Sequence, residues 1–244
     1  MLKNSLNVII IAIAAIISSY LFSNAFQNRN KSNDTISVTG SGKKDFISEL
    51  IVWNGSFSKK SATLKEAYAA LDADREKIKN YLLGKGISTT EMVFSAVNFN
   101  KDFETTFNEN GTTRQQIFTG FTLTQSVNIQ SKEVNKIEEI SRQSSELINS
   151  GVEFYSSPPE YYYTKLAELK IQMIAEATKD ASARAKSIAE NADANLGSLK
   201  KSDMGVFQIT GQNSSEDFSY GGSFNTQSKN KTANITVRLV YQVN

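Results

Sequence analysis

The chain contains neither histidine nor cysteine among its 244 residues. Ser-His-Asp and Cys-His catalysis, His-ligated metals and zinc sites therefore lack the groups that they require. The remaining candidates are carboxylates: Asp72, Asp74 and Glu76 cluster in one segment, and Glu138 and Glu139 in another. Because positions two apart do not share a helix face, we interpret these groups as solvated surface. We predict no catalytic residue, no metal site and no cofactor.

A second candidate is the glycine-rich run Gly40-Ser41-Gly42, which precedes Lys43 and Lys44. The backbone N–H groups of such a run could bind a phosphate. However, the spacing is not that of a P-loop, and strand-like residues rather than a helix follow. We therefore interpret the two glycines as a bulge or a tight turn.

Aromatic residues gather in two places where a partner could bind. One is a run of three tyrosines at 161–163, and the other is a Gly/Ser/Asn-rich segment over 212–231. Tyrosine is enriched at protein interfaces, which favours an interaction role. The alternatives are a stacked ligand near 161–163 and a surface loop without a specific role over 212–231. The predicted interaction residues are Tyr161, Tyr162, Tyr163, Phe218, Tyr220 and Phe224.

Alternating apolar residues predict the sheet that positions these groups. Two long alternating runs flank Asn110-Gly111, a dipeptide typical of hairpins because both residues accept positive φ. The polar tip of this hairpin, over 104–116, is expected to project from the core and is a further candidate for interaction. The expected strands are 35–39, 50–60, 93–107, 117–129, 152–156, 201–210 and 232–243.

Three helices are predicted from apolar residues that recur every three to four positions, over 61–85, 132–149 and 162–195. The last helix has an alanine-rich stripe that allows close approach to a sheet. Long hairpins require antiparallel pairing. We therefore expect residues 35–244 to form one α+β domain, with a largely antiparallel sheet, long hairpins and three helices.

Residues 6–22 form an apolar run near the N-terminus, and a membrane-spanning helix needs about 20 such residues. We expect a transmembrane anchor within residues 1–26, followed by a polar linker over 27–34. The alternatives are a signal peptide cleaved after Ala25, since Ser23-Asn24-Ala25 resembles a cleavage site, and a buried core helix. The predicted membrane-anchor residues are Val8, Ile9, Ile10, Ile11, Ile13, Ile16, Ile17, Leu21 and Phe22.

Three segments of the body resemble the SIMPL-domain family, whose bacterial members include periplasmic and outer-membrane-associated immunogenic proteins. They are ISVTGSGKKDF at 36–46, the helix YYYTKLAELKIQMIAEATKDASARAKSIAENADANLG at 161–197, and the closing strand TANITVRLVYQV. The most specific part is the alanine-rich helix that ends in Leu196-Gly197. The resemblance implies an exported α+β domain without established catalytic residues. It also implies, from some members, a link to oxidative-stress tolerance and, from one, a large channel-like ring.

The sequence thus predicts a non-catalytic protein of the cell envelope, anchored in the inner membrane with a periplasmic domain, that assembles with copies of itself. The alternative location is a cleaved protein that is soluble in the periplasm or associated with the outer membrane. The alternative function is a module that binds a small molecule or stress ligand near 161–163. The net charge is +2 with both signs mixed along the chain, so we expect no nucleic-acid partner.

Overall fold

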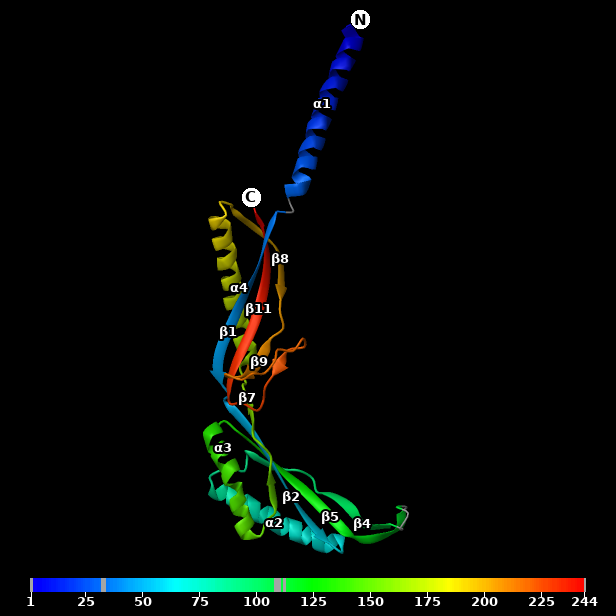
Figure 1. The fold of residues 1–244 in the computed structure, drawn as a ribbon, viewed down its shortest axis with the longest axis vertical. Coiled ribbons are helices and arrows are strands. Elements are labelled where there is room, and N and C mark those ends of the chain that lie inside the picture. The colour runs from blue at the N-terminus through cyan, green and yellow to red at the C-terminus, as the bar shows by residue number, and fades with distance from the viewer. Residues whose placement is uncertain (1, 32–33, 108–110, 112, 244) are drawn as a thin grey trace.

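The computed structural model describes residues 2–31, 34–107, 111 and 113–243, and for residues 2–10, 27–31 and 113 it describes only the backbone. Two β-sheets follow one another along an elongated body, and each sheet has its own hydrophobic core (Figure 1). We call the part built from β1 and residues 166–243 the terminal lobe, and the part built from residues 50–162 the central lobe. Helix α1 (Leu2–Lys31) extends from the end of the terminal lobe.

The terminal lobe is built on one long antiparallel pair. β1 (Thr35–Ile47) pairs with β11 (Asn230–Val243) along its whole length. Helix α4 (Leu166–Asn191) packs across both strands (Figure 1). The other strands of this sheet are β8 (Leu196–Met204) and β9 (Gln208–Gly211), which pair antiparallel with β11, and β10 (Ser223–Phe224), which pairs in parallel with β9.

Small residues on both sides allow α4 to lie close to β1. Ala177, Ala181 and Ala185 are fully buried on the helix. A Cβ added at Gly40 would lie 2.3 Å from the backbone oxygen of Ala177, and one added at Gly42 would lie 2.6 Å from that of Met173. The glycines therefore serve helix packing. They lie inside a continuous β1–β11 register, so the interpretation of a bulge or a tight turn was wrong.

The central lobe is a second antiparallel sheet. β2 (Leu50–Ser61) pairs with β5 (Thr113–Ser131), and β5 pairs on its other side with β3 (Met92–Phe94) and β4 (Asn98–Phe107). The opposite edge is formed by two short strands that pair with β2. These are β6 (Phe154–Ser156) and β7 (Glu160–Tyr162).

Helices cover one face of this sheet. α2 (Leu64–Gly84) has Thr63 as its N-cap, whose side chain accepts a hydrogen bond from the backbone N–H of Glu66. α3 (Val134–Gln143) continues as a 3-10 helix, η1 (Ser144–Ser150). The apolar side chains between sheet and helices form the core of the lobe. Its largest fully buried members include Trp53, Ile51, Leu71, Ile78, Leu82, Ile129, Ile137 and Leu147.

The expected fold class was wrong in its single sheet, because the strands divide between two sheets. The described residues hold four α-helices, which are α1 and three in the body. Strand pairing explains one shifted boundary: Tyr161 and Tyr162 pair with β2 as part of β7, so α4 begins at Leu166 and not at Tyr162. The predicted antiparallel pairing is present in every described strand pair except β9–β10.

The prediction of an N-terminal transmembrane or signal helix is also corrected. Nowhere in the described residues does a helix combine the length and the apolarity needed to cross a membrane. The side chains of α1 are described over 11–26, and this stretch includes four polar residues at 18, 19, 23 and 24. Ile11, Ile13, Ile16, Ile17, Leu21 and Phe22 are exposed on α1, whereas the side chains of Val8, Ile9 and Ile10 lie outside the described ones.

The two lobes are joined where the chain crosses between them. The backbone N–H of Ser48 donates to the carbonyl of Lys229 at 2.9 Å, and that of Tyr161 donates to Thr226 at 2.7 Å. The ammonium of Lys229 reaches α3, where it forms an ion pair of 3.0 Å with Glu138. Strand ends, loop and helix thus meet at one junction.

Candidate interaction surface

The acidic clusters are held in ion pairs and do not converge on one another. Asp72 pairs with Arg75 at 2.9 Å, and Glu138 pairs with Lys229. Asp74 is buried, contrary to the prediction of a solvated face, and its carboxylate lies 2.9 Å from the ammonium of Lys59. In the described part of the chain, no group of three or more acidic residues is placed to hold a metal ion.

The glycine run in β1 does not have the geometry of an anion site. The backbone N–H of Ser41 donates to a carboxylate oxygen of Asp180 on α4 at 2.9 Å. This hydrogen bond lowers the pKa of Asp180, and so do the hydrogen bonds from Arg184. The N–H that a phosphate would use is thus already bonded to an anionic side chain.

The three consecutive tyrosines have different surroundings. Tyr161 is buried in the core of the central lobe, and the ring of Tyr163 packs against Phe46 with 4.8 Å between centroids. The hydroxyl of Tyr162 donates to Glu160, and its ring lies 6.4 Å from that of Phe224. The structure therefore brings together Tyr162 and Phe224, while Tyr161 and Tyr163 serve internal packing.

The segment over 212–231 carries three exposed aromatic residues, Phe218, Tyr220 and Phe224. Its base is fixed by Glu216, whose carboxylate accepts from the backbone N–H of Gly211 at 3.2 Å and from the side chain of Asn225. The ammonium of Lys231, which is buried, donates to the carbonyl of Asn225. The segment is thus a loop anchored at its base that exposes three rings.

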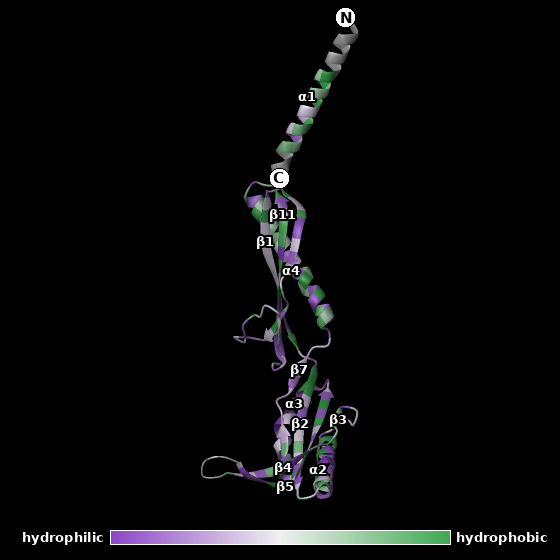
Figure 2. Ribbon diagram, turned by 90° about the vertical axis from the view of Figure 1, so that its right-hand side faces the viewer, coloured by the Kyte–Doolittle hydropathy of each residue, from purple (hydrophilic) through white to green (hydrophobic). Residues whose placement is uncertain are grey.

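The hairpin of β4 and β5 continues beyond the rest of its sheet as a two-stranded arm. β2 ends at Ser61, which pairs with Phe121, whereas β4 and β5 remain paired out to Phe107 and Thr113. We call Asp102–Phe107 together with Thr113–Gly120 the arm. It projects sideways from the central lobe (Figures 1 and 2).

A glycine lies at the root of the arm. Gly120 has φ +141°, and a Cβ there would lie 2.5 Å from the carbonyl oxygen of Ser61. The register of β4 with β5 shifts at this point, because Asp102 pairs with Gly120 but Phe103 pairs with Phe118. Such a bulge bends a hairpin and changes which residues share a face.

One face of β4 and the arm is aromatic and open to solvent. Phe99, Phe103 and Phe107 of β4 are 57%, 52% and 63% exposed. The ring of Phe118 lies 5.8 Å from that of Phe103 and 5.1 Å from that of Phe121. The bulge therefore places Phe118 beside Phe103, on the same side as Phe121, which is partly buried against the core.

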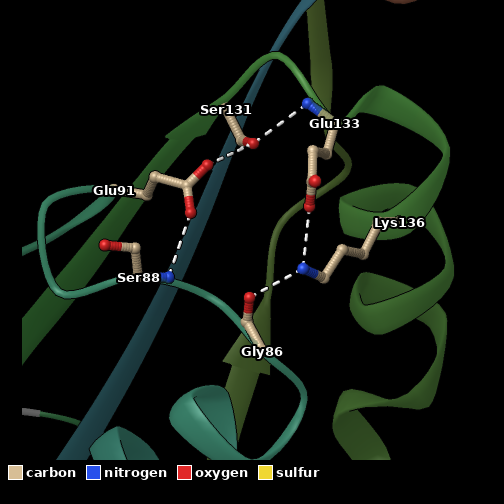
Figure 3. A network of polar contacts seen from close by, with 6 residues as sticks. All are labelled: Gly86, Ser88, Glu91, Ser131, Glu133 and Lys136. Atoms are coloured by element: carbon tan, nitrogen blue, oxygen red, sulfur yellow. Dashed lines mark hydrogen bonds and ion pairs between the residues drawn. The ribbon is translucent and has the colours of Figure 1, made fainter.

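At the end of the central-lobe sheet away from the arm, a network of polar contacts joins the sheet to α2 and α3 (Figure 3). The carboxylate of Glu91 accepts hydrogen bonds from the hydroxyl of Ser131 and the backbone N–H of Ser88. Both hydrogen bonds lower the pKa of Glu91, and the one from Ser131 has the larger effect. The ammonium of Lys136 on α3 donates to the carbonyl of Gly86, just after α2, at 2.7 Å. The network joins β3, β5 and both helices.

A shallow cavity of about 560 Å³ opens at the opposite edge of the same sheet. Its lining combines serines of β2 with Ile148, Val152 and Tyr155. The only acidic group in this lining is Glu153, and the lining contains no lysine or arginine. The cavity therefore offers hydroxyl and apolar contacts but no nucleophile paired with a base.

The arm overlaps the tip over 104–116 that the sequence offered as a further candidate for interaction, although its phenylalanines were not among the six predicted interaction residues. Their alternation was visible in the sequence, and the tip was expected to project. What the sequence did not show is that β2 ends early, so that along the arm β4 is the only described strand that pairs with β5. The dipeptide at the predicted turn lies partly outside the described residues, since Asn110 is not described and Gly111 has φ +77°.

A comparison with protein families finds one match to this chain. The SIMPL family model, described as a protein of unknown function (DUF541), matches residues 36–241. The match covers β1 through β11, and so includes both lobes, the junction and the arm. No curated protein matches the chain.

Proposed function

Since this chain belongs to the SIMPL family, a family described as of unknown function, we propose that it is a non-catalytic protein of the cell envelope that assembles with copies of itself. The observation that carries the proposal is the arm with its exposed phenylalanines. A two-stranded hairpin is only marginally stable alone in water, and exposed strand edges are templates for further pairing. Pairing of the arm with another copy, with the phenylalanines in contact across the seam, would reduce both disadvantages.

The non-catalytic part of the proposal rests on composition and on the arrangement of the acidic groups. The chain has no histidine or cysteine. The carboxylates considered as acid–base candidates lie in ion pairs, Asp74 with Lys59 and Glu138 with Lys229. In these ion pairs the carboxylates act as contacts that stabilise the fold.

The envelope location is carried over from the periplasmic and outer-membrane-associated proteins that the sequence resembles. Fractionation of cells that express the chain tests this part separately. We expect the chain to be recovered with envelope proteins. Recovery together with cytoplasmic enzymes would overturn the location and leave the assembly untouched.

The alternative of a small-molecule site near 161–163 has no observation in its favour. Tyr161 is buried in the core, and Tyr163 packs on Phe46. The alanine stripe of α4 faces the backbone of β1 at a distance that leaves no room for a Cβ at Gly40. The residues expected to form that pocket are already in contact with other parts of the chain.

Light scattering of the purified full chain across a wide range of concentration tests the assembly. We expect a defined mass that is an integer multiple of the mass of one chain. A single-chain mass at every concentration would overturn the proposal. A mass that grows without limit would also contradict it, because it would indicate aggregation rather than assembly.

A further inference from the structure

We propose that β4 pairs antiparallel with β4 of a second copy, in the register that places Phe103 opposite Phe103 of that copy. This inference rests on the proposed self-assembly and deepens it, because it names the surface and the geometry. The partner is a second copy of this chain.

The first step of the argument is that one edge of β4 is open. β4 forms its ladder with β5 from Asn98↔Thr124 to Phe107↔Thr113. Among the described strands, none pairs with the other side of β4. An open edge of ten residues can accept an added strand through its backbone N–H and C=O groups.

The second step is the spacing of the phenylalanines. Phe99, Phe103 and Phe107 lie four positions apart, so all three are on the same face of the strand. They are also symmetric about Phe103. An antiparallel pairing centred on Phe103 therefore places Phe99 opposite Phe107 of the second copy, Phe107 opposite Phe99, and Phe103 opposite Phe103.

Other registers lose this match. A shift of one residue would turn the phenylalanines of the two copies to opposite faces. A shift of two would place Phe99 opposite Thr105 and Phe103 opposite Lys101, with no aromatic pair. A shift of four would keep two aromatic pairs in place of three. The self-pairing centred on Phe103 is thus the best aligned, and a two-fold symmetric contact requires this self-complementarity.

The third step concerns the other face of β4, where Asp102 would lie opposite Glu104 of the second copy. Two like charges opposite one another are unfavourable. Asp102 is already paired with Lys60 at 3.2 Å and accepts a hydrogen bond from Thr122 at 2.6 Å. The side chain of Lys60 is 57% exposed, so its charge is available to the incoming Glu104 as well.

The fourth step is the size of the contact. Edge pairing brings six half-exposed phenylalanine rings, three from each copy, side by side on one face of a continuous sheet, so the flanks of the rings leave water while their outer faces stay open. Specific interfaces begin at about 1,200 Å². The ring flanks supply only a minor part of that area, and the two backbones with their flanking polar residues supply most of it. The expected contact is therefore small and depends on the strand ladder.

Cysteine cross-linking tests the register, and a chain without native cysteine makes the result unambiguous. Directly opposite residues have Cα atoms about 4.5–5.5 Å apart, which is within the range of a disulfide. We expect full-length Phe103→Cys to form a covalent dimer under mild oxidation. We also expect a mixture of Phe99→Cys and Phe107→Cys to form mixed dimers.

The matched controls are the same two variants taken singly. In the proposed register, residues 99 of the two copies lie eight positions apart, roughly 27 Å, so Phe99→Cys alone should remain monomeric on a denaturing gel. The same holds for Phe107→Cys alone. Cross-linking of Phe99→Cys alone, or equal cross-linking of all three single variants, would overturn the register.

Light scattering of the same samples separates this inference from the proposed function. If the unmodified chain is oligomeric and Phe103→Cys does not cross-link, the self-pairing of β4 is wrong while self-assembly stands. If the chain is monomeric at every concentration and no variant cross-links, both are wrong.

Discussion

At the scale of single residues, the buried side chain of Lys231 offers a direct test of how burial changes the pKa of an ammonium group. Its ammonium donates to the carbonyl of Asn225 at the base of the 212–231 loop. Burial lowers the pKa of Lys231 from 10.5 to about 8, and the nearby Glu216 opposes this effect. Above about pH 8 the folded state therefore favours the neutral amine, whereas the unfolded chain keeps the charge up to about pH 10.5.

This lowered pKa predicts a pH-dependent stability. Between about pH 8 and pH 10.5 the folded state binds fewer protons than the unfolded state, so stability rises with pH across that window. The lowering corresponds to about 3 kcal/mol. We expect unfolding by urea at increasing pH to show the wild type gaining on Lys231→Met by an amount of this order. The exposed Lys200→Met serves as control, and parallel curves for all three proteins would contradict the assignment.

The lowered pKa of Glu91 predicts a second pH-dependent change in stability, at acid pH. Hydrogen bonds from Ser131 and Ser88 lower its pKa from 4.5. Its contribution is therefore present above pH 4.5 and is lost as the pH falls through the lower, folded-state value. We expect Glu91→Gln to cost about 1–2 kcal/mol of unfolding free energy at pH 7 and less at acid pH. Glu76→Gln, at an exposed ion pair, is the control, and equal losses would refute a special role for Glu91.

At the scale of elements, the contact between α4 and β1 depends on the absence of a side chain at Gly40. An added Cβ would overlap backbone atoms of α4 at Ala177 and Ala181, which cannot rotate away. We expect Gly40→Ala to lower the unfolding free energy by about 1–3 kcal/mol or more. The matched change is Gly84→Ala at the end of α2, where nothing lies within 4 Å of the new Cβ. Its expected effect is neutral to stabilising, and a similar loss in both variants would contradict the packing argument.

The elements themselves differ in how well the sequence predicts them. α2 and α4 carry long apolar stripes, and their interiors match the predicted ranges. The start of α4 could not be predicted, because Tyr161 and Tyr162 are recruited by β2 from a distant part of the chain. The early end of α3 at Gln143, where the chain continues as η1, likewise depends on packing in the central lobe.

The arm shows the same limit for the candidate site. Alternation along 93–107 and 117–129 predicted the hairpin and its projection. It could not predict that β2 ends at Ser61, nor that the bulge at Gly120 moves Phe118 to the side of Phe103. Both are facts of strand pairing between segments far apart in the sequence. The position of Phe118 beside Phe103 follows from the bulge.

At the scale of the whole molecule, two lobes share one junction, and the arm lies on the lobe remote from α1 (Figure 1). Backbone bonds at Ser48 and Tyr161, together with the ion pair of Lys229 with Glu138, connect the lobes. This arrangement holds the arm away from the body, where it can meet another copy without interference from the terminal lobe.

Sedimentation velocity of the full chain tests the central claim, self-assembly through the arm, most directly. The test variant replaces Phe99, Phe103 and Phe107 with serine. The matched control replaces Ile148, Leu199 and Ile171, which are also exposed, with serine. We predict that the wild type and the control sediment as one defined oligomer and that the arm variant sediments as a folded monomer. A wild type that sediments as a single chain at every concentration, or an arm variant that stays as oligomeric as the control, would contradict the account.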